Sequence, residues 1–352
     1  MEAVLVNKLI EIKTTIFFSK LTSEEKREHI KQVLGVLEIK QYEKYLGLPS
    51  FVGRQKKKKK KPSFEFIKEK VWRKLQGWEE KLLSQAGREV LIKAVVQAIP
   101  TYTMSCFKLP IGLCTELERL IRKFWWGQRG DRRKIHWVKW ETLVQSRLDG
   151  DMGFKDLALF NDALLAKQAW RLLHNKDSLL HRLFKSKFFP DCSFMEASEC
   201  DNGSYAWRSL LKGREVLWRG ARWRVGNGEA IKIWEYPWLP SLEQPRVLSP
   251  APEGLQEATV DFLINPANRS WDTELLVGVF APIEAALIQK IPLSPITVED
   301  KLIWSHVPSG VYLVKSSYRF LAKEKGGSRD SPQTQTESPS VWRRIWGAFS
   351  SE

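Results

Sequence analysis

Apolar residues recur with the period of an α-helix from residue 62 to about residue 185, and this pattern constrains the fold more than any other feature. The first helix is expected to open at Pro62 and to end near Gly77. Its predicted inner face is formed by Phe64, Ile67, Val71 and Leu75. Trp72 falls beside this face, so we expect it to pack into the core.

Three further stretches predict helices at about Ser84–Ala98, Leu113–Trp125 and Leu157–His174. The predicted inner face of the first of these consists of Leu91, Ala94, Val95 and Ala98. A helix start is also indicated at residues 22–25, where Thr and Ser precede two Glu residues. Most of the chain before residue 190 is therefore predicted to be helical.

The pattern changes to one typical of strands near residue 220. Arg222–Val225 and Ile231–Trp234 alternate with period two on either side of Gly226-Asn227-Gly228. Such a glycine-rich turn between alternating segments predicts a β-hairpin over residues 222–234. The expected fold class is α+β, with a mainly helical region followed by a smaller region that contains this hairpin.

Two segments have a composition typical of weakly ordered chain. Residues 237–300 are rich in Pro and acidic residues, which predicts a poorly ordered linker with one helix near Ile283–Gln289. Residues 324–340 combine Gly, Ser, Gln, Thr and Pro, and we expect them to be disordered.

Positive charge is concentrated in the first 140 residues. The chain has a net charge of +16, from 57 Lys and Arg against 41 Asp and Glu. Residues 54–93 carry a net +9 and residues 116–140 a net +5, whereas residues 141–352 are neutral. A localised basic field attracts polyanions, so nucleic acid is the expected partner. A membrane is not expected, because no long apolar face or spanning segment accompanies the charge.

The most basic segment is the run Lys56–Lys61. Three interpretations remain open for it. The run is an inert solvated loop, a contact to nucleic-acid phosphates, or a nuclear localisation signal. The last two are compatible with each other.

The 16 tryptophans have two possible uses. A large ring fills a core, or it stacks on a base next to Lys and Arg. Burial is the expected use for Trp72, Trp125 and Trp126, and stacking remains the alternative within the basic region. Five tryptophans of the neutral region are expected to pack in the core or hairpin; they are Trp207, Trp218, Trp223, Trp234 and Trp238.

Few residues indicate a metal site or a nucleophile. Cys106, Cys114, Cys192 and Cys200 have no zinc-ligand spacing, so buried free thiols are expected. His136 is interpreted as a packed or hydrogen-bonding residue rather than a base. Asp149 and Asp151 flank a glycine, which is a weak indication of metal binding.

Eight phrases, taken in order, carry a family resemblance. They are Lys44–Pro49, Trp72–Trp78, Leu83–Glu89, Phe124–Gly127, Ile135–Trp137, Ala163–Trp170, Trp223–Gly228 and Val314–Tyr318. This series resembles the reverse transcriptase polyprotein of plant LINE-type (non-LTR) retrotransposons, from the thumb to the start of the zinc-binding domain. The order of the phrases, rather than any single one, makes the resemblance specific. Asp151 and Ser317 depart from the family pattern.

The resemblance implies a division into four regions. Residues 1–48 correspond to the end of a polymerase palm-like segment, and residues 49–190 to a helical thumb-like region. Residues 191–300 correspond to a connection region with the predicted hairpin. Residues 301–352 correspond to the truncated start of the zinc-binding domain.

The resemblance also implies what the chain lacks. The catalytic centre of the family uses an adjacent Asp-Asp pair that holds metal ions, and this sequence has no such pair. Met1 is expected to follow that segment, and the zinc ligands are expected beyond Trp346. The parent enzyme is an RNA-directed DNA polymerase that would need Mg and a structural Zn. This chain is expected to need no cofactor and to be inactive by itself.

The predicted function is a sequence-independent grip on RNA or an RNA–DNA duplex in the nucleus. An upstream polymerase segment supplied in trans is a further expected partner. The residues expected to contact phosphates are basic side chains of the first 140 residues. They are Arg54, Lys56, Lys57, Lys58, Lys59, Lys60, Lys61, Lys68, Lys74, Lys81, Arg88, Arg132, Arg133 and Lys134. The alternative is a transposon-derived relic with no selected activity, or with only a protein-interaction role.

Overall fold

The structure is a computed structural model, and it describes most of the chain. The described residues are 22–34, 44–45, 48–49, 62–79, 83–127, 135–145, 152–199, 203–241 and 244–327. The chain divides into two compact units, residues 1–65 and residues 66–352. Residues 328–352 fall outside the described part, as do most of the residues predicted to be disordered.

The first unit contains one described helix and one small ladder. Helix α2 spans Glu24–Leu34, as the sequence pattern at residues 22–25 predicts. Strand β1, Lys44–Tyr45, pairs antiparallel with β2, Leu48–Pro49.

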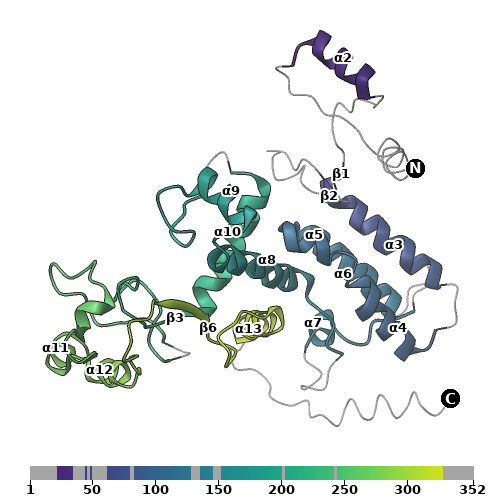
Figure 1. Cartoon of the computed structure of the whole chain (residues 1–352). Coiled ribbons are helices and arrows are strands. Elements are labelled where there is room, and N and C mark those ends of the chain that lie inside the picture. Colours follow the sequence, from purple (N-terminus) through teal and green to yellow (C-terminus); the bar gives the residue numbers. More distant parts are fainter. Residues whose placement is uncertain are drawn as a thin grey trace, which may run out of the picture. The chain divides into compact units, whose positions relative to one another are not determined.

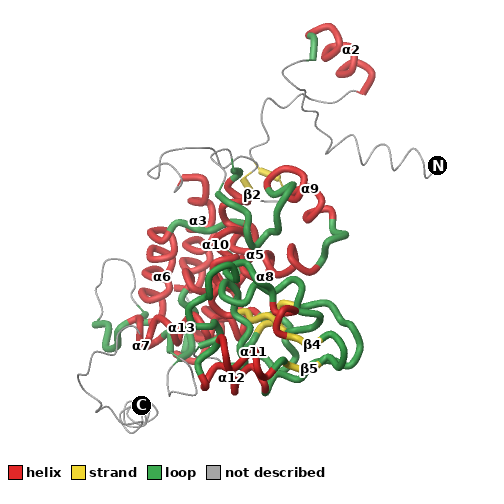
Figure 2. Tube along the Cα trace, turned by 90° about the vertical axis from the view of Figure 1, so that its left-hand side faces the viewer, coloured by secondary structure: helices red, strands yellow, loops and turns green. Residues whose placement is uncertain are grey.

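The second unit is mostly helical (Figure 1). Its first half contains α3 (Glu65–Glu79), α4 (Gln85–Leu91), a π-helical turn (Ile92–Val96), α5 (Thr101–Cys106), α6 (Ile111–Trp125), α7 (Trp140–Leu143) and α8 (Leu157–His174). Its second half contains α9 (Leu179–Phe188), α10 (Tyr205–Gly220), α11 (Thr273–Val279), α12 (Pro282–Gln289) and α13 (Val314–Gly327). The strands are β3 (Ala221–Arg224), β4 (Ile264–Asn265), β5 (Ser270–Trp271) and β6 (Lys301–Trp304), and they form two small antiparallel sheets, drawn in yellow in Figure 2 where they are in view. The predicted α+β class with a mainly helical first part is confirmed.

Helix α3 follows the predicted stripe but corrects two predictions. All four positions of the predicted inner face are buried. The helix continues through Gly77 to Glu79, so the predicted end at Gly77 is wrong. Trp72 is 53% exposed, so its predicted burial is also wrong. Trp72 follows Val71 directly and therefore points about a quarter turn away from the stripe.

The second predicted helix is divided in the structure. Ser84 caps α4, because its Oγ accepts a hydrogen bond from Gly87 N at 3.2 Å. After Leu91 the chain forms the π-helical turn, which shifts the buried face to Ile92 and Val96. The predicted inner face is wrong at Ala94 and Ala98, which are exposed.

Helix α8 organises the second unit, since α5, α6, α9, α10 and α13 all pack against it (Figure 1). Its boundaries are those that the sequence predicts. Asp156 caps its first turn by accepting hydrogen bonds from Ala158 N and Leu159 N, both at 3.0 Å. Gly213 of α10 lets the two helices approach closely, because a Cβ there would lie 2.5 Å from the carbonyl carbon of Leu165.

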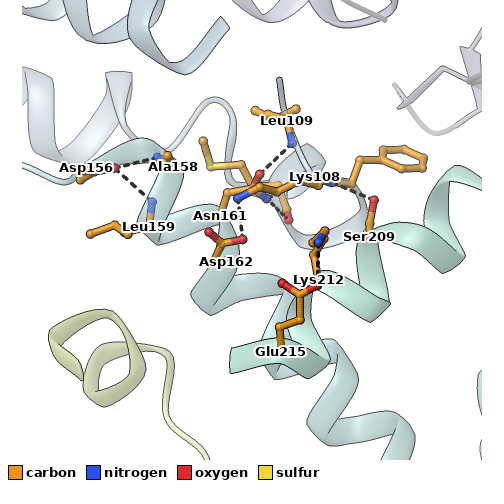
Figure 3. Close-up of polar contacts among 12 residues, drawn as sticks. Lys108, Leu109, Asp156, Ala158, Leu159, Asn161, Asp162, Ser209, Lys212 and Glu215 are labelled. Carbon is orange, nitrogen blue, oxygen red and sulfur yellow. Dashed lines mark hydrogen bonds and ion pairs between the residues drawn. The ribbon is translucent and has the colours of Figure 1, made fainter. Parts of the chain in front are cut away.

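A buried amide joins α5 and α6 to α8 (Figure 3). Asn161 of α8 is fully buried, and its Oδ1 accepts a hydrogen bond from Leu109 N at 2.7 Å. Its Nδ2 donates to the carbonyl oxygens of Met104 and Phe107 at 2.8 and 3.0 Å. The adjacent Lys108 forms an ion pair with Asp162 at 2.5 Å. Both Nδ2 hydrogens and one lone pair of Oδ1 are therefore used in hydrogen bonds to the backbone.

One buried core lies around Trp207 of α10, which is fully buried. Phe188 stacks on it with the ring centroids 4.7 Å apart, and Phe189 lies parallel to it at 5.7 Å. The same cluster includes buried residues of α8, α9, β3, β6 and α13. This core thus contains residues from both sides of the boundaries predicted near 190 and 300, although these boundaries themselves remain predictions.

The predicted hairpin is wrong in its pairing. Strand β3 exists, but its antiparallel partner is β6, which brings Arg224 opposite Lys301. The residues expected to form the second strand turn instead, with Lys232 bridging to Thr259. Gly226 allows the backbone of residues 298–299 to approach closely, because a Cβ at this position would lie 2.2 Å from the Val298 carbonyl oxygen.

A second core occupies the segment predicted to be a linker. Trp238 is 1% exposed, and its Nε1 donates a hydrogen bond to the Ile233 carbonyl oxygen at 2.9 Å. The buried side chains around it come from residues 225–288 and include residues of α11 and α12. The prediction of poor order is therefore wrong for residues 244–300, whereas the predicted helix at Ile283–Gln289 is confirmed by α12.

Candidate nucleic-acid interface

Helix α3 exposes cations on one side and an aromatic ring on another. Lys70, Arg73 and Lys74 are exposed on this helix, and the indole of Trp72 lies among them in sequence. The buried stripe of the same helix anchors this surface to the rest of the second unit. The geometry therefore presents positive charge and a flat ring on one rigid element.

A hollow of about 480 Å³ lies on the side of α3 that carries these cations. It is lined by Lys70, Arg73, Lys74, Gly77, Trp78 and Ile99. The described part of the lining contains three cations and no carboxylate. The ring of Trp78 is held from behind by Phe124 of α6, with the centroids 6.1 Å apart. Such a concave basic surface is suited to phosphate groups, because clefts of one charge sign focus the electrostatic field.

The predicted site residues on this part of the chain have different environments. Lys74 lines the hollow. Lys68 forms an ion pair with Glu116 of α6 at 3.1 Å. The guanidinium of Arg88 is half-buried, with Nη1 lying 3.5 Å from both the Trp125 carbonyl oxygen and Gln85 Oε1. Lys68 and Arg88 therefore have contacts within the fold, and their role in phosphate binding stays a prediction.

The remaining predicted contacts lie outside the described residues. They are Arg54, Lys56–Lys61, Lys81, Arg132, Arg133 and Lys134. Asp149 and Asp151 also lie outside this part of the chain.

Two cations of the hollow, Lys70 and Arg73, are absent from the predicted set. Their signal in the sequence is their position away from the apolar stripe of α3. The exposure of Trp72 could be found in the same way, by placing it at one residue past a buried position.

A second basic surface lies where α6 ends. Arg122 and Lys123 belong to the last turn of α6. The ring of His136 stacks on Trp126 with the centroids 6.1 Å apart, which agrees with its interpretation as a packed residue. Burial, followed by the charges of Arg122 and Lys123, lowers the pKa of the His136 imidazole below its ordinary value. The adjacent Trp137 is 72% exposed, so this surface also combines cations with a ring.

The described residues offer no evident reactive centre. No group of three or more His, Cys, Asp or Glu residues within this part of the chain is placed to hold a metal ion. Cys106, Cys114 and Cys192 are free thiols, as predicted, and burial raises the pKa of Cys114 to about 12. A thiol with such a pKa is a poor nucleophile.

Among the described helices, none combines the length and the apolar character needed to cross a membrane.

One carboxyl group has an unusual environment, and it serves the fold. Glu118 of α6 accepts a hydrogen bond from Leu157 N at 2.9 Å, at the start of α8. Burial, with the nearby charge of Asp156, raises the pKa of Glu118 to about 7. Glu118 thus caps α8 from a neighbouring helix, and its position explains the shift without a catalytic role.

Comparison with known proteins identifies two plant relatives. An uncharacterized mitochondrial protein of Arabidopsis thaliana is 46% identical over 143 residues, which make up 40% of this chain and 93% of that protein. A putative ribonuclease H protein of Arabidopsis thaliana is 30% identical over 272 residues, or 75% of this chain. The chain spans only 43% of the length of that second relative. No protein-family model matches the chain. The chain therefore belongs to the same plant protein family as this mitochondrial protein.

Proposed function

We propose that this chain is part of a LINE-type reverse transcriptase and that it grips RNA or an RNA–DNA duplex by the backbone, without sequence specificity. The observation that carries the proposal is the basic hollow on α3, which is lined by Lys70, Arg73 and Lys74. Trp72 is exposed on a different side of the same helix. Lys and Arg neutralise phosphates and release counterions, which gives affinity independent of sequence. An exposed ring adds stacking on an unpaired base.

The proposal concerns binding rather than synthesis. Polymerisation would need the carboxylates and metal ions of a palm segment, which we propose is supplied by the parent polyprotein or in trans. The name of the larger Arabidopsis relative refers to ribonuclease H, and we do not extend that activity to this chain. A nuclear location is part of the proposal, because the Lys56–Lys61 run is of a length that localisation signals use.

The test is the salt dependence of binding. Fluorescence anisotropy with a labelled RNA–DNA duplex would measure affinity between about 50 and 200 mM salt, where several phosphate contacts reduce binding by orders of magnitude. We expect the logarithm of the affinity to fall linearly with the logarithm of the salt concentration. Duplexes of unrelated sequence should give the same line. A flat response would contradict the proposal.

A second candidate is a transposon-derived relic with only a protein-interaction role. The observation that favours it is the outer face of α9, where Leu179, Leu180 and Leu183 are exposed. Native-state proteolysis distinguishes the two candidates. A structured nucleic-acid-binding module should give a resistant fragment that contains both buried cores, whereas rapid cleavage throughout would favour the relic.

A further inference from the structure

A second basic pocket lies in the part of the chain whose net charge is zero. It has a volume of about 380 Å³ and lies between α8, the β3–β6 ladder and the loop that precedes α13. Its lining includes Lys167, Arg171 and His174 of α8, Arg224 of β3 and Lys301 of β6. Among the described residues that line it, none is an Asp or Glu. The pocket is built from the second unit alone and shares no residue with the hollow on α3.

The cations of this pocket face one another in two like-charged pairs. Lys167 and Arg171 are separated by one helical turn, an arrangement that destabilises a helix. Arg224 and Lys301 are register partners across the antiparallel ladder, where like charges also repel. Among the described residues, none forms an ion pair with Arg171, Arg224 or Lys301. The positive charge of the pocket is therefore not compensated by the fold.

Contacts to backbone carbonyl oxygens hold the side chains of Lys167 and His174 in place in the pocket. The Nζ of Lys167 donates a hydrogen bond to the Tyr312 carbonyl oxygen at 2.8 Å and has two further hydrogens to donate. The ring nitrogens of His174 lie 3.0 Å from the Trp170 carbonyl oxygen and 3.2 Å from the Leu302 carbonyl oxygen. Since carbonyls only accept, both contacts are hydrogen bonds when the ring is the imidazolium.

The electrostatic environment of Lys167 agrees with uncompensated charge. Burial, followed by the charge of Arg171, lowers the pKa of the Lys167 ammonium group below its ordinary value. An anion bound between these groups would relieve the repulsion. A neighbouring hollow of about 530 Å³ shares Arg224 but also contains Glu299 and is mostly apolar, so it is less suited to an anion.

We propose that this pocket binds phosphate groups, either in a free oligophosphate such as the chain of a nucleotide or in a nucleic-acid backbone. Arg171, Arg224 and Lys301 would contact the phosphate oxygens through charge-assisted hydrogen bonds. Lys167 would donate from the floor of the pocket. The proposal is independent of α3, because it concerns different residues and a different surface.

The experiment uses the full chain, inorganic tripolyphosphate and a pair of matched variants. The pocket variant is Arg171→Gln with Lys301→Gln, both at exposed positions. The control is Lys315→Gln with Arg319→Gln, which removes two exposed cations one turn apart on α13, outside the pocket. Thermal unfolding and isothermal titration calorimetry are measured for each protein with and without tripolyphosphate.

The proposal predicts that the pocket substitutions do not reduce stability without ligand but do weaken the binding of tripolyphosphate. Tripolyphosphate should raise the Tm of the wild-type chain and of the control, because it binds the folded state. The pocket variant should be at least as stable as wild type without ligand, because one member of each repelling pair is gone. Its affinity for tripolyphosphate should be about tenfold lower or weaker still, as expected for the loss of two charge-assisted contacts.

The source of the phosphate is distinguished with an RNA–DNA duplex. If the pocket lies on the path of a nucleic acid, the pocket variant also loses affinity for the duplex. If the ligand is a free oligophosphate, duplex affinity is unchanged while the tripolyphosphate effect is lost. The proposal is overturned if tripolyphosphate does not bind the wild-type chain, or if the pocket variant binds it as well as the control does. Neither result depends on whether α3 binds nucleic acid.

Discussion

Trp72 and Trp207 are both helical residues of the second unit, but their surroundings are opposite. Trp207 of α10 is fully buried, and Phe188 of α9 stacks on its ring. Trp72 is more than half exposed, and its neighbours in the sequence include lysines and an arginine. The tryptophan content of the chain therefore serves two purposes. One group of rings builds the core around α8, and another is available to a ligand.

Charge shows the same contrast between the two halves of the second unit. On α3 the positive charge is visible in the composition of the surrounding sequence. In the later half the composition is neutral, yet the pocket between α8 and the β3–β6 ladder gathers cations alone. The net charge of each segment thus identifies the first basic surface but not the second. The acidic residues that make the later half neutral lie elsewhere than in the described lining of this pocket.

The largest effect is expected in the core. Gly213→Ala should destabilise the chain by about 3 kcal/mol or more, because the new Cβ would lie 2.5 Å from the Leu165 backbone and force α10 away from α8. Urea unfolding measures the change. Gly278→Ala is the control, since nothing lies within 4 Å of its Cβ position in α11. The control should be neutral or stabilising by up to about 1 kcal/mol. Equal losses in both variants would contradict the close packing of α8 and α10.

The carboxylate of Asp300 should give the next largest effect. It accepts hydrogen bonds from Gly226 N and Gly228 N at 2.6 and 3.0 Å, and from Ala230 N at 2.9 Å. Asp300→Ala would leave these donors without the carboxylate and should cost about 2–3 kcal/mol. Asp300→Asn retains an acceptor oxygen and should cost less. Hydrogen exchange would follow the three amides, and their unchanged protection in the Ala variant would contradict this assignment.

Glu118 links the α3–α6 side to α8 and should make stability depend on pH. Its pKa is raised to about 7, so the folded state holds a proton that the unfolded state loses near pH 4.5. The contribution of Glu118 to stability is therefore present below pH 4.5 and is lost as the pH rises to about 7. Relative to Glu118→Gln, the wild-type chain should lose about 2 kcal/mol over this range. Parallel Tm curves for the two proteins from pH 5 to 8 would contradict the shift.

The smallest effect on stability, but a measurable one on binding, is expected for Trp72. Trp72→Ala should change the free energy of unfolding by less than about 0.5 kcal/mol, because the ring is largely exposed. Its affinity for single-stranded RNA should fall by about 1–2 kcal/mol if the ring stacks on a base. A large loss of stability, or unchanged RNA affinity, would show that Trp72 belongs with the packing tryptophans.

The sequence predicts elements that depend on local order. The apolar stripe of α3, the boundaries of α8 and the helix at α12 are all recovered, because capping residues and helical spacing are local signals. Pairings between distant segments are not recovered. Nothing near Gly226 in sequence indicates that Asp300 binds its turn, or that β3 pairs with β6 rather than with the next segment.

The two candidate surfaces also differ in whether the sequence predicts them. Lys74 is placed on the hollow as a basic residue off the apolar stripe, and Lys70 and Arg73 carry the same signal. The pocket on α8 depends on Arg224 and Lys301, which come together from two strands although they are 77 positions apart in the sequence. A local sequence pattern therefore cannot reveal it.

The central claim, that the exposed side of α3 grips a nucleic-acid backbone, is tested most directly by the salt slope of a triple variant. Lys70→Gln, Arg73→Gln and Lys74→Gln together should weaken binding to an RNA–DNA duplex and lower the slope by about two to three units, near one for each lost phosphate contact. The matched control replaces Lys315, Arg319 and Lys323 of α13 by Gln, and its slope should stay close to that of wild type. An α3 variant with the wild-type affinity and slope would contradict the account.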